Sequence, residues 1–115
     1  MNTPCISQMK FPYKGGIHFI HPDQIIRLQA DSNYTYIHVC NRKPLLMAKV
    51  LGDYESILEP FGFVRIHRSH LINRLHISRV DPKGSIIMDD ESIAEISRRK
   101  RKLVRQLFPT SSQVA

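Results

Sequence analysis

The chain has 115 residues, the length of one domain with a modest core, and it carries 17 Lys and Arg against 10 Asp and Glu, a net charge of +7. It has no run of 18 apolar residues, no signal-peptide pattern, and too few cysteines for a disulfide scaffold or a zinc motif. These features indicate a basic cytoplasmic domain with no cofactor and no membrane partner. A redox pairing of Cys5 with Cys40 stays open as an alternative.

The first half of the chain has the pattern of short strands separated by turns. Residues 1–14 show no clear periodicity, so we expect an N-terminal extension before a domain that spans residues 15–109. Aromatic and β-branched residues, bounded by turn-forming residues, predict strands at 17–20, 25–30, 34–40 and 45–48. The second and third of these strands are expected to form a hairpin.

A helix is predicted over residues 51–58, because apolar residues repeat there at helical spacing and Pro60 and Gly62 follow. Further strands are predicted at 75–80, 85–88 and 93–96, with a Pro-Gly turn over residues 81–84 between the first two. Strands therefore outnumber helices and the connections are short. The fold class expected from this pattern is mostly β, built from small antiparallel sheets and hairpins with two short helices.

The second helix is predicted to begin after Ser97, which is an N-cap residue, and to end before Pro109. Its start concentrates six positive charges without an acid: Arg98, Arg99, Lys100, Arg101, Lys102 and Arg105. The helix macrodipole favours acids at this end, so the arrangement is typical of an anion-binding surface more than of a helix selected for stability. Residues 110–115 are expected to form a disordered tail.

The segment of residues 63–73 carries the most specific signal. Apolar residues flank a polar cluster made of Arg65, His67, Arg68, Ser69, His70 and Asn73. Arginine, serine and asparagine are donors suited to phosphate oxygens and to base edges. The pattern therefore predicts a binding edge that apolar anchors hold in place.

Three segments together resemble the LytTR family of DNA-binding domains, which are output domains of many bacterial response regulators. Residues 63–73 (FVRIHRSHLIN) match its "F-x-R-x-H-R-S-x-L-x-N" run. Residues 28–37 (LQADSNYTYI) and 96–99 (ISRR) are similar to its first and last signatures and stand in the right order. A chain of this length would be a member without a receiver domain, or a fragment of a longer protein.

The resemblance implies an elongated arrangement of small antiparallel sheets whose loops enter successive major grooves on one face of the DNA. It implies a transcriptional regulator of two-component systems that binds repeated half-sites and can self-associate on DNA. The residues expected to read bases are Asn33, Tyr34, Thr35, His67, Arg68 and Arg99. The residues expected to bind phosphates are Arg65, Ser69, Asn73, Arg98 and Arg101.

An enzyme or a metal site is one rival interpretation, based on His67, His70 and His76. In one extended segment, His67 and His70 would lie on opposite faces, and no Cys pair or Glu is placed to complete a zinc site. No arrangement for nucleophilic catalysis can be recognised either. The sequence therefore predicts neither a metal site nor an enzyme.

An RNA-binding or protein-interaction module is the second rival. Tyr34 and Tyr36 lie two residues apart, so they share a face of their strand and would suit stacking on bases. The chain lacks the pattern of glycines and aromatics that marks common RNA-binding sheets. Duplex DNA therefore remains the favoured partner.

Overall fold

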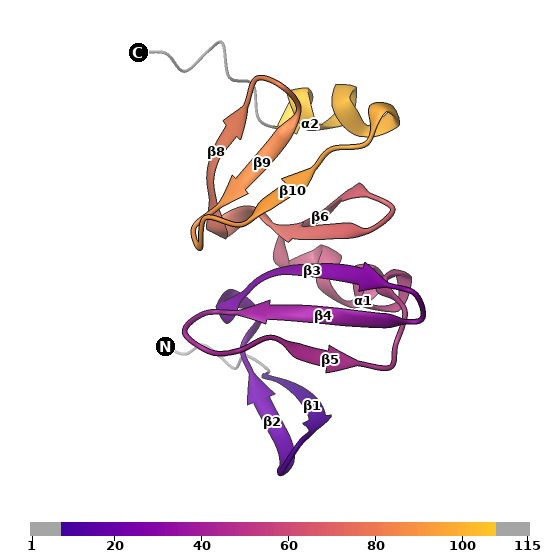
Figure 1. Cartoon of the computed structure of the whole chain (residues 1–115), viewed down its shortest axis with the longest axis vertical. Coiled ribbons are helices and arrows are strands. Elements are labelled where there is room, and N and C mark those ends of the chain that lie inside the picture. The colour runs from indigo at the N-terminus through magenta and orange to yellow at the C-terminus, as the bar shows by residue number, and fades with distance from the viewer. Residues whose placement is uncertain (1–7, 108–115) are drawn as a thin grey trace.

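A computed structural model describes residues 8–107, which form three antiparallel sheets and two α-helices (Figure 1). The elements in chain order are β1 (Met9–Tyr13), β2 (Gly16–Ile20), η1 (Pro22–Gln24), β3 (Ile25–Asp31), β4 (Tyr34–Val39), β5 (Leu45–Met47), α1 (Leu51–Leu58), η2 (Glu59–Phe61), β6 (Phe63–His67), β7 (His70–Asn73), η3 (Arg74–His76), β8 (Ile77–Asp81), β9 (Ser85–Met88), β10 (Ile93–Glu95), η4 (Arg98–Lys100) and α2 (Arg101–Leu107). The prediction of a mostly β fold with two short helices is confirmed.

The central sheet has five strands in the order β5-β4-β3-β7-β6. Its middle strand, β3, pairs with both β4 and β7, and Gln29 lies opposite Tyr36 on one side and His70 on the other. The β3–β4 turn and the β6–β7 turn consequently lie at the same end of the sheet (Figure 1). Two of the three signature segments thus meet there.

The C-terminal part of the described chain forms a second layer. Strands β8, β9 and β10 make a three-stranded sheet, and η4 and α2 follow β10 directly. This layer packs on one face of the central sheet, whereas α1 packs on the other face. The connection after β10 therefore brings the third signature segment to the end of the sheet where the β6–β7 turn lies.

Part of the expected N-terminal extension, residues 9–13, forms a strand that was not predicted from the sequence. Met9–Tyr13 forms β1, which pairs with β2 through a turn at Lys14 and Gly15; Gly15 and the first residue of β2, Gly16, both have positive φ. Phe11 in the middle of β1 is 2% exposed and belongs to the core. Met9, Phe11 and Tyr13 alternate with the exposed Lys10 and Pro12, but the run is short and a proline within it argues against a strand.

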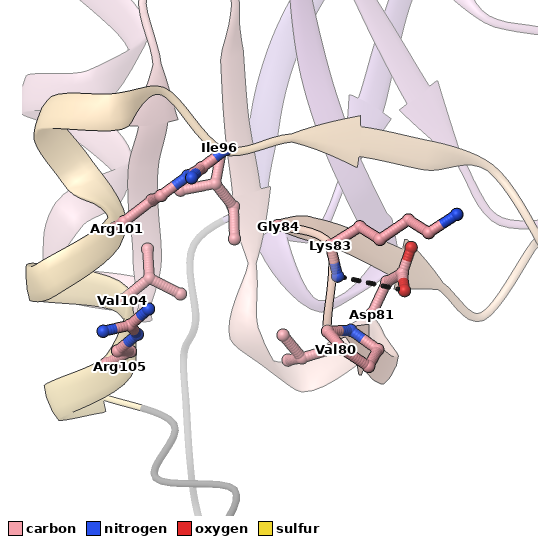
Figure 2. Close-up of a pocket in the computed structure, with 9 residues that line it drawn as sticks. Val80, Asp81, Lys83, Gly84, Ile96, Arg101, Val104 and Arg105 are labelled. Atoms are coloured by element: carbon pink, nitrogen blue, oxygen red, sulfur yellow. Dashed lines mark hydrogen bonds between the residues drawn. The ribbon is translucent and has the colours of Figure 1, made fainter.

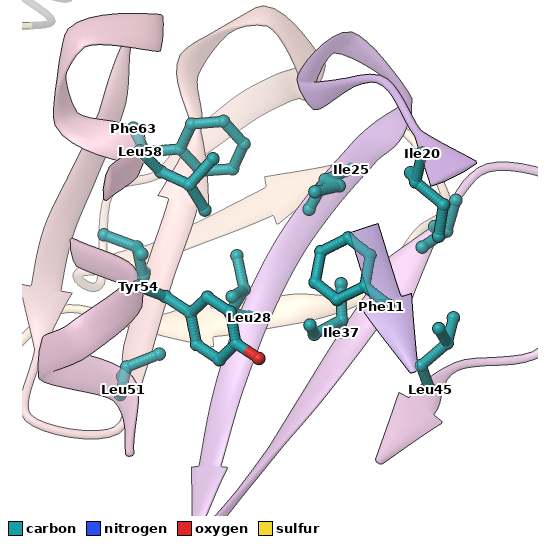
Figure 3. Packing of buried hydrophobic residues seen from close by; sticks show 12 residues of the cluster. Phe11, Ile20, Ile25, Leu28, Ile37, Leu45, Leu51, Tyr54, Leu58 and Phe63 are labelled. Atoms are coloured by element: carbon teal, nitrogen blue, oxygen red, sulfur yellow. The ribbon is translucent and has the colours of Figure 1, made fainter. Parts of the chain in front are cut away.

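Two hydrophobic clusters lie on opposite faces of the central sheet. The first packs α1 and β1 on the sheet and includes Phe11, Leu28, Ile37, Tyr54, Leu58 and Phe63 (Figure 3). The second joins the sheet to the three-stranded layer and includes Ile26, Ile66, Ile72, Ile86, Met88 and Val104. Alternation along β6 and β7 supplies both clusters, since Leu71 belongs to the first and Ile72 to the second.

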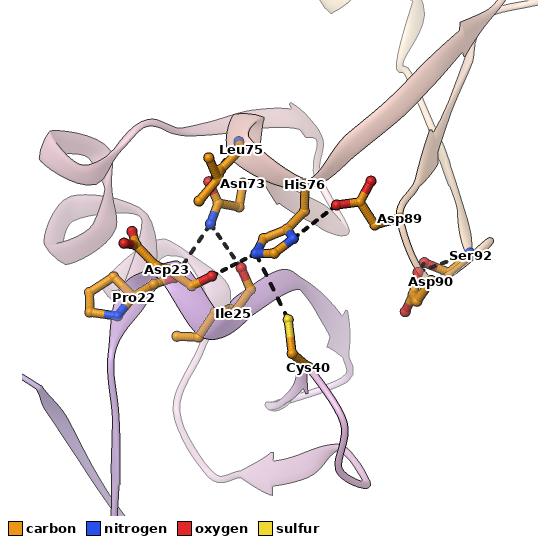
Figure 4. A network of polar contacts seen from close by, with 10 residues as sticks. All are labelled: Pro22, Asp23, Ile25, Cys40, Asn73, Leu75, His76, Asp89, Asp90 and Ser92. Carbon is orange, nitrogen blue, oxygen red and sulfur yellow. Dashed lines mark hydrogen bonds and ion pairs between the residues drawn. The ribbon is translucent and has the colours of Figure 1, made fainter.

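A polar network joins the central sheet to the segment that leads into the three-stranded layer (Figure 4). The Asn73 side-chain amide donates to the carbonyls of Pro22 and Ile25, and its oxygen accepts from the Leu75 N–H. His76 lies between the Asp23 carbonyl and the Asp89 carboxylate. The strand predicted at residues 75–80 accordingly begins only at Ile77, because Asn73 caps the short helix η3 first.

Ser97 is the N-cap residue as predicted, with its hydroxyl accepting from the Lys100 N–H at 3.3 Å. The first turn after it is a 3-10 turn that continues into α2. Pro109, the tail at 110–115 and Cys5 lie outside the described residues. Cys40 is a free, half-buried thiol in the described part of the chain.

Candidate nucleic-acid interface

Arg65 bonds to the backbone of the β6–β7 turn. Its guanidinium donates to the carbonyl of His67 at 2.9 Å, to the carbonyl of Arg68 at 2.6 Å and to the carboxylate of Glu55 on α1 at 2.7 Å. The side chain is only 20% exposed. Arg65 was predicted to bind phosphate; in the structure its guanidinium is already bonded to the turn and to Glu55, and it fixes the shape of the turn.

His67 is oriented by the same turn. Its Nδ1 accepts from the Ser69 backbone N–H at 3.0 Å, so in the neutral ring the proton sits on Nε2, which can donate to a ligand. The rings of His67 and His70 lie 5.2 Å apart between centroids. The expectation that they occupy opposite faces is wrong, because they are cross-strand partners on either side of a two-residue turn.

Arg68 and Ser69 form the tip of this turn. Arg68 is exposed, and within residues 8–107 its guanidinium has no hydrogen-bond or ion-pair partner. Ser69 is half-buried, and its carbonyl accepts from the Ala30 N–H at 2.9 Å. That bond ties the end of β3 to the β6–β7 turn. The tip thus presents one free cation on a backbone fixed by its neighbours.

The segment Ser97–Lys100 lies beside this tip. The Ser97 N–H donates to the Ile66 carbonyl at 2.8 Å, which fixes the start of the helical segment against β6. Arg98 and Arg99 are exposed. An open depression between the turn and the helical segment is lined by Glu55, Arg65, His67, Arg68, Ser97, Arg99 and Lys100. The second and third signature segments therefore share one basic surface.

The first signature segment forms the β3–β4 turn at the same end of the sheet. Asn33 is exposed and Tyr34 is 49% exposed, and Ser32 adopts a left-handed conformation that makes the turn tight. Tyr36 lies on the same face as Tyr34, as predicted, and is half-buried beside His38. Asn33 and Tyr34 are thus placed to extend the surface formed by the other two segments. We call the surface made by all three segments the signature edge.

The structure corrects two predicted contact residues, Thr35 and Asn73. Thr35 is fully buried and its hydroxyl donates to the Lys49 carbonyl at 2.6 Å. Asn73 is 2% exposed and its amide is used by the polar network at the start of β3. Both side chains already have partners inside the domain, because buried polar groups must be hydrogen-bonded. Neither side chain is exposed in the structure.

Arg101 lies apart from the signature edge. It lines a second depression, between α2 and the β8–β9 turn, together with Arg105. Arg101 was predicted to bind phosphate together with Arg98, but it lines this second depression and not the one beside the β6–β7 turn. Lys100, which was not among the predicted contact residues, lines the first depression with Arg99. The sequence could have indicated Lys100 as a contact residue, because it stands only three positions after the N-cap Ser97.

Within residues 8–107, no group of three or more His, Cys, Asp or Glu is arranged to hold a metal ion. His76 lies in η3, which follows β7, whereas the His67–His70 pair lies at the start of β7. The ring nitrogens of His76 bond to the Asp89 carboxylate and the Asp23 carbonyl. None of the helices in this range is long and apolar enough to cross a membrane.

Comparison with known proteins gives a consistent result. The family model of the LytTr DNA-binding domain matches residues 15–109. The transcriptional regulatory protein LytR of Staphylococcus aureus (strain N315) is 39% identical over 64 residues, which are 56% of this chain and 26% of that protein. The heme-containing CO-sensing transcriptional regulator RcoM 2 of Paraburkholderia xenovorans is 27% identical over 100 residues, 83% of this chain and 37% of that protein. The matched part of the chain thus spans between 26% and 37% of the length of these relatives.

The fold also matches a solved structure. The LytTr DNA-binding domain of a putative methyl-accepting/DNA response regulator from Bacillus cereus superimposes with a TM-score of 0.78, covering 90% of this chain and 97% of that domain. The sequence identity is 21%, so this likeness concerns the fold alone.

Proposed function

The chain belongs to the LytTR family of DNA-binding domains, and from this we propose that it recognises a specific duplex DNA sequence through the signature edge. The family assignment makes it a DNA-binding domain of the kind found in transcription regulators. The finer statement, that side chains of the three turns read bases in the major groove, is our proposal. It favours duplex DNA over the RNA-binding alternative.

The observation that carries this proposal is the convergence of three sequence-distant segments on one edge. Arg68 and Arg99 lie more than 30 positions apart in the chain, yet they line the same depression. Both are exposed arginines, and arginine suits a bidentate contact to the O6 and N7 of guanine. Asn33 and Tyr34 add an amide and a phenol at the same end of the sheet.

The proposed division of roles follows from what each side chain already contacts. Asn33, Tyr34, His67, Arg68 and Arg99 are proposed to reach base edges. Arg98, Lys100 and the Ser69 hydroxyl are proposed to bind phosphates. Arg65 is proposed to act indirectly, by holding the carbonyls of the turn so that Arg68 points away from the domain.

One such edge offers a small contact area, since single DNA-binding modules bury about 600–1,000 Å². We therefore propose that two copies bind repeated half-sites, spaced by about one helical turn of 10–10.5 base pairs or a multiple of it. Self-association on DNA and a cytoplasmic location, where bacterial DNA is accessible, belong to the same proposal.

Selection from a randomised duplex library by the purified chain tests this function. The expected result is one enriched motif that occurs twice at a fixed spacing. The matched control is Arg79→Ala, which removes the same charge from an exposed position on β8 away from the edge. Arg79→Ala should enrich the same motif, whereas Arg68→Ala should lose preference at one position of each repeat. A library that yields no motif at moderate salt would overturn the proposal.

A further inference from the structure

A second depression lies on the other side of the C-terminal helical segment, between α2 and the β8–β9 turn (Figure 2). It has a volume of about 230 Å³ and is lined by Val80, Asp81, Pro82, Lys83, Gly84, Ile96, Arg101, Val104 and Arg105. Ligand pockets commonly measure about 300–1,000 Å³, so this one suits a body no larger than one ring or a short acyl chain. None of these residues lines the depression of the signature edge.

The floor of the depression is apolar. Val104 on α2 and Ile96 after β10 belong to the second hydrophobic cluster, and Val80 on β8 packs against that cluster. Figure 2 shows the Val104 and Val80 side chains facing each other across the depression. An apolar surface of this kind gains free energy when a ligand carbon skeleton covers it and displaces water.

The rim of the depression is positively charged. Arg101 and Arg105 stand on α2 beside the opening, and Lys83 lines it from the β8–β9 turn with its side chain extending away from α2 (Figure 2). Within residues 8–107 none of these three cations forms an ion pair. The one acid on the rim, Asp81, accepts a hydrogen bond from the Lys83 backbone N–H at 3.3 Å. The rim therefore carries a net charge of +2, from three cations and one carboxylate.

Gly84 lets Arg101 reach over the floor. The glycine has a φ of +100°, and a Cβ atom added there would lie 3.2 Å from Nη2 of Arg101. The absence of a side chain at this turn thus leaves the space that the guanidinium occupies. Arg101 and Arg105 are one helical turn apart on α2, so both can approach one ligand group from the same side.

We propose that this depression binds a small organic carboxylate, with its apolar body on the Val80–Ile96–Val104 floor and its carboxylate between Arg101 and Arg105. A guanidinium pairs with a carboxylate through two parallel N–H···O bonds, which gives the site both energy and orientation. The apolar floor decides against a DNA phosphate as the intended occupant, because a phosphodiester on this rim would leave the three apolar side chains uncovered. The site is independent of the function proposed for the signature edge.

Binding can be measured without DNA, by titrating the ¹⁵N-labelled chain with phenylacetate or hexanoate and following backbone amide shifts. Phenylacetamide, hexanamide and inorganic phosphate serve as comparison probes, because each retains only the apolar body or only the charge. The expected result is saturable shifts confined to residues 80–84, 96 and 101–105 with the carboxylates. The amides and phosphate should bind about tenfold more weakly or worse, as expected when one charge-assisted bond or the apolar contact is lost.

Two double variants with the same charge loss identify the residues. Arg101→Gln/Arg105→Gln should weaken carboxylate binding about tenfold or more, while Arg79→Gln/Lys102→Gln, at exposed positions off the rim, should bind as the parent does. Thermal unfolding of each variant checks that the fold is retained. Equal shifts with phosphate, amide and carboxylate would overturn the proposal, as would a duplex DNA that shifts these amides while no carboxylate does.

Discussion

The two depressions on either side of the C-terminal helical segment draw on the same run of basic residues but differ in construction. At the signature edge, Arg99 and Lys100 face a turn whose backbone is held by Arg65 and by bonds from Ala30 and Ser97. At the second depression, Arg101 and Arg105 stand over an apolar floor. The basic residues form one continuous run in the sequence, but helical geometry places some of them at the polar signature edge and others at an amphipathic pocket.

The largest difference between the two surfaces should appear in DNA affinity. Arg68→Ala/Arg99→Ala should weaken binding to a selected duplex by about 2–6 kcal/mol, from about 1–3 kcal/mol for each arginine that reads a base. Arg101→Gln/Arg105→Gln should leave the preferred sequence unchanged. Fluorescence anisotropy with selected and scrambled duplexes measures both effects. Equal losses on the two duplexes would show that Arg68 and Arg99 contact phosphates and do not read bases. The signature edge would then not carry the sequence preference.

The next effect concerns the frame on which both surfaces depend. Asn73→Ala should lower the free energy of unfolding by about 1–3 kcal/mol, because the Ile25 carbonyl loses the Asn73 amide and the Leu75 N–H loses its acceptor. Ser69→Ala, at the tip of the turn, is the control and should change stability by less than about 0.5 kcal/mol. Urea denaturation gives both values. If Asn73→Ala is as stable as the parent but binds DNA more weakly, Asn73 contacts DNA after all.

A smaller effect is expected in the dependence on salt. If Arg98 contacts one phosphate, Arg98→Ala should reduce the slope of log K against log salt by about 0.9, with the selected sequence unchanged. Arg79→Ala removes the same charge from β8 and should change the slope by much less. Titrations of both variants at several ionic strengths decide the matter. A larger change for Arg79→Ala would show that the docking orientation is wrong.

The smallest effect near neutral pH involves His38 and His70, which lie on the face of the central sheet toward the three-stranded layer. Burial, with a further contribution from the Arg27 guanidinium, lowers the pKa of each imidazole to about 4. The unfolded chain binds these protons at a pKa near 6.5, so it holds more protons than the folded chain between pH 6.5 and 4. The free energy of unfolding should therefore fall as the pH drops through this window.

Denaturation curves at pH 7.5, 6 and 5 measure that change. His38→Gln should flatten the dependence, since one of the two groups no longer titrates. His18→Gln, in the N-terminal hairpin, is the comparison variant and should leave most of the dependence in place. An unchanged slope in His38→Gln would mean that this imidazole titrates alike in the folded and unfolded chains.

The sequence predicted most of the strands and both helices because those elements carry strong local signals. Ser97 could be recognised as an N-cap, and Pro60 and Gly62 as a helix end, from residue type and position alone. β1 was missed because Pro12 argues against a strand, whereas the burial of Phe11 beside Tyr54 depends on a distant part of the chain. No pattern within residues 9–13 encodes that contact.

The candidate site was predicted less completely, for a related reason. Residue type identified donors such as Thr35, Asn73 and Arg65, but it could not show whether the domain itself uses them. Asn73 caps η3 and Arg65 bonds to two carbonyls of the turn, and both facts depend on the tertiary arrangement. In the folded domain Arg68 and Arg99 are exposed and free for a ligand, whereas Arg65, with the same guanidinium group, is already bonded.

The bonds that position the signature edge come mainly from the backbone. Ala30 and Ser97 anchor the neighbouring segments through their N–H groups, and Arg65 bonds to carbonyls that any residue would supply at positions 67 and 68. None of these bonds uses the side chain at position 33, 68 or 99. Those three positions can therefore be exchanged with little cost to folding, and a small library randomised there should yield domains of equal stability with new operator preferences.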